Sequence, residues 1–467
     1  MYTIPKNLDN NKIFLVRRSE IFGRLDPSVY SNNFQFVSQL FENKKLSDIA
    51  FINPTTNLSS LSNEDDISFI QMDAVDEHLG NLKYIETKKV AEKVGFTRFK
   101  ENDLIWAKIT PCMQNGKSAI VRNTINGFAL GSTEFFIIRP KNENIKVEYL
   151  HFLLRDKRVL ETAVRYFGGS AGQQRVSKDF LLNFNVPVPS IKVQEKIVSI
   201  IQNAYAQKEA KKAEAKELLA NIDTYLLNEL GITLPEKDNS LIARIFTTKF
   251  SEIVGGRFDS EYYKEYNKSL LKSINDSFYQ LDKIRNNCDF ISGYAFSSET
   301  YVENSECVLI TIKNISKNSI DLKNVTYLPE EYYEYYKRFV ISKNDLLIAM
   351  TGATIGKVGI FDKDVKALLN QRNGIIKSDK MNTYYLMNLL NTDLYQTLIL
   401  RNAVGGAQPN ISETDIMKLQ IPLPPLEKQN EIAEHIAGIR TQAKALHQEG
   451  EQVLSVAKQQ VEQMILG

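Results

Sequence analysis

Residues 420–436, QIPLPPLEKQNEIAEHI, decide the fold, because a near-copy, NVPVPSIKVQEKIVSII, stands at residues 185–201. The prolines of each copy force extended backbone, and a proline is tolerated only in the first turn of a helix. Neither residues 190–230 nor residues 426–466 contain a proline. Each copy therefore predicts a sharp junction at which a folded globule ends and a long helix begins.

The similarity extends upstream from both junctions and keeps its order. FKENDLIWAKITPCMQNGKSAIV (99–121) pairs with FVISKNDLLIAMTGATIGKVGIF (339–361), and GGSAGQQRVSKDFLLNFNVPVP (168–189) pairs with GGAQPNISETDIMKLQIPLP (405–424). The offset is 242 residues between Asn102 and Asn344 and 235 residues between Pro187 and Pro422, a drift that fits small insertions in loops. The chain is thus predicted to contain an internal repeat.

The first part of each copy spans about residues 24–189 and 257–425. It contains short runs of β-branched, aromatic and aliphatic residues, such as FFIIRP, VLITI and DLLIAM, bounded by Gly, Pro and Asn. Such runs are typical of strands and turns. Together with some helices, they predict an α+β globule in each copy.

The second part of each copy has the period of a helix. Apolar residues recur mostly at alternating steps of four and three, which is typical of a coiled-coil seam. The seam residues are Ile197, Ile201, Ala204, Leu219, Ile222 and Leu226 in the first copy, and Ile432, Ile436, Ile439, Ala443, Leu446, Val453, Ala457 and Val461 in the second. One such helix alone would indicate a dimerisation stalk, but two in one chain, each after a similar globule, favour an internal antiparallel pair.

Length and composition exclude several classes of protein. At 467 residues the chain can form two or three domains of roughly 150 residues. Its net charge is only +2, so the basic groups of any nucleic-acid interface must be placed locally. The sequence has no apolar run of about 18 residues and no signal-peptide pattern, which predicts a cytoplasmic protein without a membrane partner.

Motifs that could indicate catalysis are incomplete. The three cysteines stand singly and none of the four histidines belongs to a ligand motif, so no metal site is predicted. TGATIGKVG (351–359) is one residue short of a phosphate-binding loop between Gly352 and Gly356, and Val358 stands where a hydroxyl residue should follow Lys357. FGGSAG (167–172) resembles a methyltransferase turn, but the D/N-P-P-aromatic motif is missing. We therefore assign no catalytic residue.

Polar glycine-containing stretches occur at equivalent places in both copies. They are WAKITPCMQNGKSA (106–119), GGSAGQQRVSK (168–178), MTGATIGKVG (350–359), LNQRNG (369–374) and GGAQPNIS (405–412). Arg and Lys can bind guanine or phosphate, Gln and Asn can bind adenine, and Gly lets backbone approach closely. Any one of these stretches could simply turn the chain between strands, but their repetition without catalytic groups favours a pair of binding faces.

The chain resembles the specificity (S) subunit of type I restriction-modification enzymes over nearly its whole length. The resemblance is carried by SGYAF (292–296), KNDLLIAMTGATIGKVG (343–359) and IPLPPLEKQNEIAEHI (421–436). The first copy departs from it at WAKITPCMQNGK (106–117). The resemblance implies two α+β target recognition domains in a pseudo-two-fold repeat, separated by two long antiparallel helices. The domains implied are 1–189 and 233–425, and the helices are 190–232 and 426–467.

The resemblance also implies a subunit without catalysis or cofactor of its own. Each target recognition domain would read half of a bipartite site in double-stranded DNA. The helices would set the spacer and dock methyltransferase subunits, two in number, with restriction subunits joining them. S-adenosylmethionine, ATP and Mg are expected on those partner subunits, and the adenine would be flipped into the methyltransferase. The alternative is a coiled-coil scaffold whose two globules bind ligands other than DNA.

The resemblance places the DNA contacts in the polar stretches. In the first domain we expect Lys108, Thr110, Gln114, Asn115, Lys117, Gln173, Gln174 and Arg175 to face DNA. In the second we expect Thr351, Thr354, Lys357, Gln371, Arg372, Asn373, Gln408 and Asn410.

Overall fold

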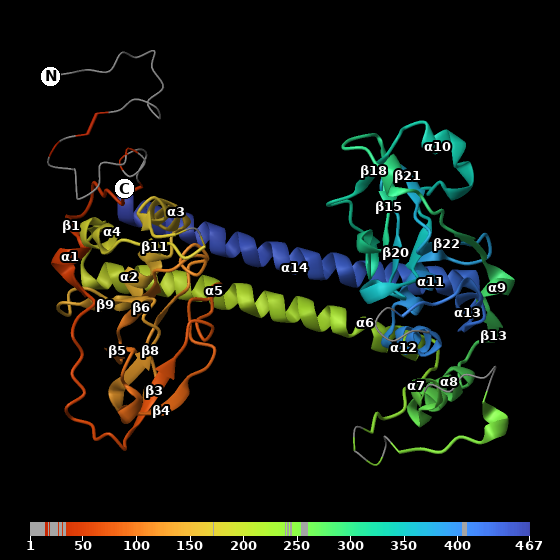
Figure 1. Ribbon diagram of the computed structural model, residues 1–467, viewed down its shortest axis with the longest axis horizontal. Coiled ribbons are helices and arrows are strands. Elements are labelled where there is room, and N and C mark those ends of the chain that lie inside the picture. The colour runs from red at the N-terminus through yellow and green to blue at the C-terminus, as the bar shows by residue number, and fades with distance from the viewer. Residues whose placement is uncertain are drawn as a thin grey trace. The chain divides into compact units, whose positions relative to one another are not determined.

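The computed structural model describes residues 34–170, 172–238, 245–253, 260–403 and 409–467, together with residues 15, 16, 18, 27, 30, 240 and 242. The chain divides into two compact units, unit 1 (residues 1–212 and 447–467) and unit 2 (residues 213–446). Each unit combines strands and helices, which confirms the predicted α+β class (Figure 1). Among the described residues, no helix is long and apolar enough to cross a membrane.

Unit 1 contains two four-stranded sheets, in the orders β2-β9-β6-β7 and β4-β3-β8-β5, and the short pairs β1-β12 and β10-β11. Its strands are β1 (Asn43–Lys45), β2 (Ala50–Ile52), β3 (Asp66–Ile70), β4 (Glu86–Lys89), β5 (Thr97–Lys100), β6 (Leu104–Ala107), β7 (Ser118–Ile120), β8 (Phe128–Gly131), β9 (Phe135–Pro140), β10 (Phe167–Gly168), β11 (Arg175–Val176) and β12 (Asn185–Pro187). Its short helices are α1 (Leu46–Ile49), α2 (Val147–Leu154), α3 (Lys157–Val164) and α4 (Lys178–Asn183).

Unit 2 contains a six-stranded sheet, β14-β22-β19-β20-β17-β16, a three-stranded sheet, β18-β15-β21, and the short pair β13-β23. Its strands are β13 (Leu281–Lys283), β14 (Asp289–Ser292), β15 (Cys307–Ile310), β16 (Ile315–Ser316), β17 (Asn318–Ile320), β18 (Thr326–Leu328), β19 (Leu346–Ala349), β20 (Val358–Ile360), β21 (Lys366–Leu369), β22 (Asn373–Lys377) and β23 (Gln420–Pro422). Its short helices are α7 (Ser260–Tyr263), α8 (Glu265–Asn275), α9 (Ile284–Asn287), α10 (Tyr332–Tyr335), α11 (Thr383–Leu390), α12 (Asp393–Asn402) and α13 (Glu413–Met417).

The strand registers confirm the internal repeat. Leu104 of β6 lies opposite Ile138 of β9 in an antiparallel pair, and Leu346 of β19 lies opposite Ile376 of β22 in the same arrangement. A parallel pair also recurs, as β3 with β8 in unit 1 and β15 with β21 in unit 2. The four named residues are buried in the cores of their units. The apolar runs that the sequence shares are therefore equivalent core strands.

A shared Asn-Asp turn precedes β6 and β19. Asn102 and Asn344 have left-handed φ angles of 69° and 72°, a conformation that asparagine tolerates better than most residues. The aspartates that follow, Asp103 and Asp345, each accept a 2.8 Å hydrogen bond from a backbone N–H three residues earlier. The repeated ND dipeptide is thus explained by turn geometry.

The proline-rich junctions are fixed in the same way in both copies. The strand that enters each junction pairs antiparallel with a strand from the start of its globule, β12 with β1 and β23 with β13. The buried hydroxyl of Tyr149 in α2 donates to the carbonyl of Pro187 at 2.9 Å, and Tyr385 in α11 donates to Pro422 at 2.9 Å. Burial raises the pKa of both tyrosines, so their hydroxyls stay protonated as donors.

The glutamine of the repeated motif fastens the start of each long helix. Gln194 and Gln429 are 0% and 3% exposed. The Gln194 side chain donates to the carbonyl of Pro189 and accepts from the N–H of Lys146, the N-cap of α2, both at 2.9 Å. Gln429 makes the equivalent pair of bonds. Its side chain donates to the carbonyl of the residue before Pro425 and accepts from the backbone N–H of the N-cap residue of α11, both at 2.9 Å.

Gln194→Ala and Gln429→Ala are each expected to destabilise their unit by about 1–3 kcal/mol, because each leaves a buried carbonyl and a buried N–H unsatisfied. Hydrogen exchange of α2 or α11 should show the loss locally. Gln207, an exposed residue of the same helix as Gln194, provides the control, and Gln207→Ala should leave exchange unchanged. Equal protection in Gln194→Ala and Gln207→Ala would contradict the assigned role.

The long helices are α5 (Ile191–Ala220), α6 (Ile222–Glu229) and α14 (Leu426–Leu466). Within unit 1, Lys208 and Lys211 of α5 form ion pairs with Glu451 and Glu449 of α14, at 2.8 and 2.6 Å, so the two helices run antiparallel there. Within unit 2, Lys428 of α14 pairs with a glutamate of α6 at 2.7 Å. Such exposed pairs add little stability, and the apolar seam contributes more.

The predicted seam is wrong at one residue, Leu219. Leu219 is 47% exposed, whereas Ala215 and Ile222 are each 7% exposed. Ala215 and Ile222 lie seven residues apart, and the position between them on the buried side of the helix is Leu218, one residue before Leu219. In the Ala/Lys/Glu-rich centre of this helix, the spacing of apolar residues therefore predicted the wrong buried face.

Candidate nucleic-acid interface

In unit 2 the structure brings three polar stretches together. The N–H of Met350 donates to the carbonyl of Arg372 at 2.9 Å, and the N–H of Ile411 donates to the carbonyl of Met350 at 3.0 Å. Thr351 also forms an isolated β-bridge with Asn410. The MTGATIGKVG, LNQRNG and PNIS segments are thus joined through their backbones.

In unit 1 the equivalent backbone is joined in the same register. The N–H of Val176 donates to the carbonyl of Lys108 at 2.9 Å, and the N–H of Thr110 donates to the carbonyl of Gln174 at 3.0 Å. Ile109 forms the isolated β-bridge, with Arg175. Both units therefore present one composite polar surface, built from a loop after a core strand and a segment before the next helix.

The SGYAF motif supports this surface in unit 2. The N–H of Tyr294 donates to the carbonyl of Leu369 at 3.0 Å, and the N–H of Gln371 donates back to the carbonyl of Tyr294 at 2.9 Å. A Cβ on Gly293 would lie 2.1 Å from the carbonyl oxygen of Asn370, so only glycine permits this approach. The motif thereby fixes the backbone that carries Gln371 and Arg372.

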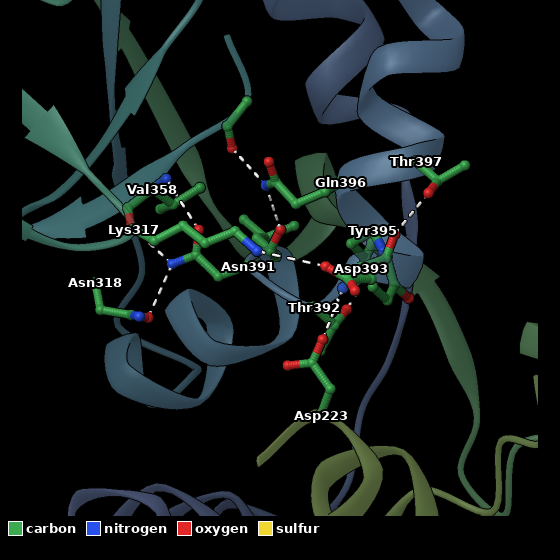
Figure 2. A network of polar contacts seen from close by, with 12 residues as sticks. Asp223, Lys317, Asn318, Val358, Asn391, Thr392, Asp393, Tyr395, Gln396 and Thr397 are labelled. Atoms are coloured by element: carbon green, nitrogen blue, oxygen red, sulfur yellow. Dashed lines mark hydrogen bonds and ion pairs between the residues drawn. The ribbon is translucent and has the colours of Figure 1, made fainter. Parts of the chain in front are cut away.

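A second group of polar contacts holds the far end of the MTGATIGKVG loop (Figure 2). The Asn391 amide donates to the carbonyl of Val358 at 2.7 Å and accepts from its N–H at 3.2 Å. Gln396 of α12 donates to the carbonyl of Gly356 at 2.7 Å. Asp223 of α6 accepts from the first N–H of α12 at 2.8 Å, and burial raises the pKa of this carboxyl. The sequence analysis missed these supporting residues, since their spacing along the chain gives no signal.

Fourteen of the sixteen predicted contact residues lie at least partly at the surface. The exposed ones are Gln114, Asn115, Gln173, Gln371, Arg372 and Asn410. The half-buried ones are Lys108, Thr110, Lys117, Gln174, Arg175, Thr351, Thr354 and Lys357.

The other two predicted contact residues are Asn373 and Gln408. Asn373 is wrong as a DNA-facing residue, because its side chain is 0% exposed and donates to the carbonyls of Ile310 and Asn370. It stabilises the loop from inside. Gln408 lies outside the described residues.

Several half-buried side chains already have partners within the protein. Arg175 forms two 2.9 Å hydrogen bonds to the carboxylate of Glu134, which raises the pKa of the guanidinium. Lys117 donates to the carbonyl of Met72 at 3.1 Å, and Thr354 donates to that of Ile312 at 3.0 Å. The exposed Gln and Arg side chains are therefore better placed than these to bind a partner.

A groove of about 420 Å³ adjoins the composite surface of unit 1. Lys108 and Arg98 both line it, and Arg98 was missed by the sequence analysis. The signal was present in the strand TRFK, because Phe99 is fully buried and the residues on either side of it must point outwards.

Comparison with known proteins assigns the fold and its composite surfaces to a family. The type I restriction modification DNA specificity domain matches residues 39–221 and again residues 279–454. The chain belongs to this family. Both composite surfaces fall within matched residues, so the chain carries two copies of the type I specificity domain.

Two specificity subunits match this chain over about three quarters of their own lengths. The type I restriction enzyme EcoAI specificity subunit of Escherichia coli is 26% identical over 449 residues, covering 83% of this chain and 75% of that protein. The MjaVIII specificity subunit of Methanocaldococcus jannaschii is 26% identical over 337 residues, covering 71% of this chain and 72% of that protein.

A solved structure that concerns complex assembly and conformational transition of the type I R-M system matches with a TM-score of 0.59. It is 16% identical and covers 91% of this chain and 96% of that chain, and at this identity the likeness shows the fold alone. Membership of the specificity-domain family favours DNA recognition over the alternative of a general scaffold.

Proposed function

We propose that the chain is the DNA-reading subunit of a type I restriction-modification complex, in which each specificity domain reads one half of a bipartite site. The observation that carries the proposal is the composite polar surface, which recurs in both copies in the same backbone register. Its exposed Gln, Asn and Arg side chains have the donors and acceptors that recognise adenine and guanine edges. The two surfaces differ in sequence, which accounts for two different half-sites.

The proposed division of labour follows the junctions. Residues 1–189 and 233–425 are the two target recognition domains, and residues 190–232 and 426–467 are the helices. A helix of 41 residues such as α14 is about 60 Å long, against about 3.4 Å of duplex per base pair. The helix pair thus sets the length of the unread spacer.

The chemistry of methylation and cleavage belongs to partner subunits in this proposal. Two methyltransferase subunits dock on the helices and bind S-adenosylmethionine, and restriction subunits bring ATP and Mg. The target adenine must leave the stack before it can be methylated. The role of this chain is to position the partners on the correct sequence.

Binding to duplex DNA tests the proposal. The full chain, purified with its methyltransferase subunits, should bind a duplex that contains its site. Its affinity should fall on the order of a thousandfold between 50 and 200 mM salt if it contacts about six phosphates. Fluorescence anisotropy across a salt series measures this fall. A complex that shows no affinity for duplex DNA, or an affinity independent of salt, would favour the scaffold alternative.

A further inference from the structure

The groove beside Lys108 is built from both sheets of unit 1. Thr97 and Arg98 come from β5, and Thr133 precedes β9. Asn53 follows β2 with a left-handed φ of 55°, and its side chain accepts a 2.9 Å hydrogen bond from the N–H of Ile137. The walls are therefore regular strands and a fixed turn, which gives a preformed site.

The groove has an uncompensated positive charge. Of its eleven lining residues, Arg98 and Lys108 are cationic and none is acidic. Within the part of the chain that the structure describes, neither Arg98 nor Lys108 forms an ion pair. Several other cations of the globule have a carboxylate partner, such as Lys89 with Asp66 at 2.8 Å. Two unpaired cations in a concave, acid-free site attract an anion.

The carboxylate of Glu134, next in sequence to a lining residue, does not neutralise this charge. Glu134 lies next to the lining residue Thr133, but both of its oxygens accept hydrogen bonds from Arg175. Four threonines also line the groove, and their hydroxyls can donate to an anionic oxygen; they are Thr55, Thr56, Thr97 and Thr133. Cations and hydroxyls are the groups that hold DNA phosphates, whereas base edges are read mainly by amides and bidentate Arg.

The groove is also continuous with the composite surface. Lys108 lines the groove, and its carbonyl accepts the N–H of Val176 in the backbone bridge that joins the two polar segments. In the second copy Met350 occupies the position of Lys108 and makes the equivalent backbone bridge. Only the first domain therefore has a cation at this position.

We propose that this groove binds the phosphate backbone of the DNA next to the half-site read by the first domain, with Arg98 and Lys108 as its cationic contacts. The proposal rests on the proposed DNA-reading function. In this proposal the groove contacts phosphates whatever the DNA sequence, while the exposed amides of Gln114 and Gln173 read bases.

Salt titrations of the full chain with its methyltransferase subunits test the groove. Arg98→Ala and Lys108→Ala should each make the plot of log affinity against log salt shallower by about 0.9, the value for one lost phosphate contact. At fixed salt, both variants should weaken binding equally to a duplex with the site and to a scrambled duplex. Arg98→Lys, which keeps the charge, should restore the slope.

Lys89→Ala is the matched control, because Lys89 is an exposed cation of the same sheet that already pairs with Asp66. It should leave the slope unchanged, and all variants should keep the wild-type hydrogen exchange of the β5 and β6 amides. The groove proposal is overturned if Arg98→Ala and Lys108→Ala keep the wild-type slope, or weaken only the duplex that contains the site. A wild-type complex without salt-dependent binding would instead overturn the DNA-reading function itself.

Discussion

Deletion of residues 209–215 together with residues 444–450 is expected to shorten the spacer of the methylated site while both half-sites stay unchanged. Each deletion removes seven residues, or about 10 Å of helix, which corresponds to about three base pairs. The deletions lie opposite each other, since Lys208 pairs with Glu451. A seven-residue deletion also keeps the apolar seam in phase. Base-resolution sequencing of methylated adenines in cells that carry the variant measures the spacer.

Deletion of residues 209–215 alone provides the control for this experiment. It shortens one helix only, so the two seams no longer match in length and methylation should be lost rather than shifted. If the paired deletion changes a half-site but leaves the spacer as it was, the helices do not act as the spacing element.

Asp103→Ala is expected to destabilise unit 1 by about 3–5 kcal/mol, the usual cost of removing one partner from a buried ion pair. Asp103 is 0% exposed and accepts hydrogen bonds of 2.6 and 2.7 Å from the guanidinium of Arg139. Its removal leaves a largely buried cation. Because the chain has two units, a single melting temperature is ambiguous. Hydrogen exchange of the β6 and β9 amides is the suitable measurement.

The internal repeat supplies the matched variant, Asp345→Ala. Asp345 occupies the equivalent turn of unit 2, where its partner is the more exposed Lys377 at 3.1 Å. Its removal should cost less, and the faster exchange should be confined to β19 and β22. Similar exchange changes in both units for either variant would contradict the assignment of these pairs to separate cores.

Much of the fold could be predicted from the sequence because local chemistry determines it. Prolines end the strand and start the helix, and the motif glutamine donates to the carbonyl five residues before it. The ND turns need a left-handed asparagine and a capping aspartate. Such constraints act within a few residues, so the same residue types recur at equivalent positions of both copies.

The errors arose where burial depends on distant parts of the chain. Asn373 follows the exposed Gln371 and Arg372 in a polar stretch, but it begins β22 and its buried side chain donates to the carbonyl of Ile310. Leu219 is apolar but lies off the seam, since the phase of a long helix is set by its partner helix. Arg98 lies far along the chain from the Asn53 turn and the Thr133 loop that complete its groove. No spacing rule reaches across such separations.

The sequence shows where the polar loops of the candidate site lie better than it shows the contacts of their individual side chains. Glycine, proline and polar residues mark where the chain turns, and the structure joins these turns into one surface in each unit. The sequence could not show that Arg175 is already paired with Glu134, since that contact joins two segments separated by 41 positions. Exposed side chains such as Gln371 and Arg372 therefore become the main candidates for base reading.

A methylation map of cells with and without the gene tests whether this chain directs DNA recognition. We expect one bipartite adenine-methylation motif, with two defined half-sites and a fixed spacer, that disappears when the gene is removed and returns when it is restored. A map that is identical in both cells, although the methyltransferase subunits are present and active, would contradict it.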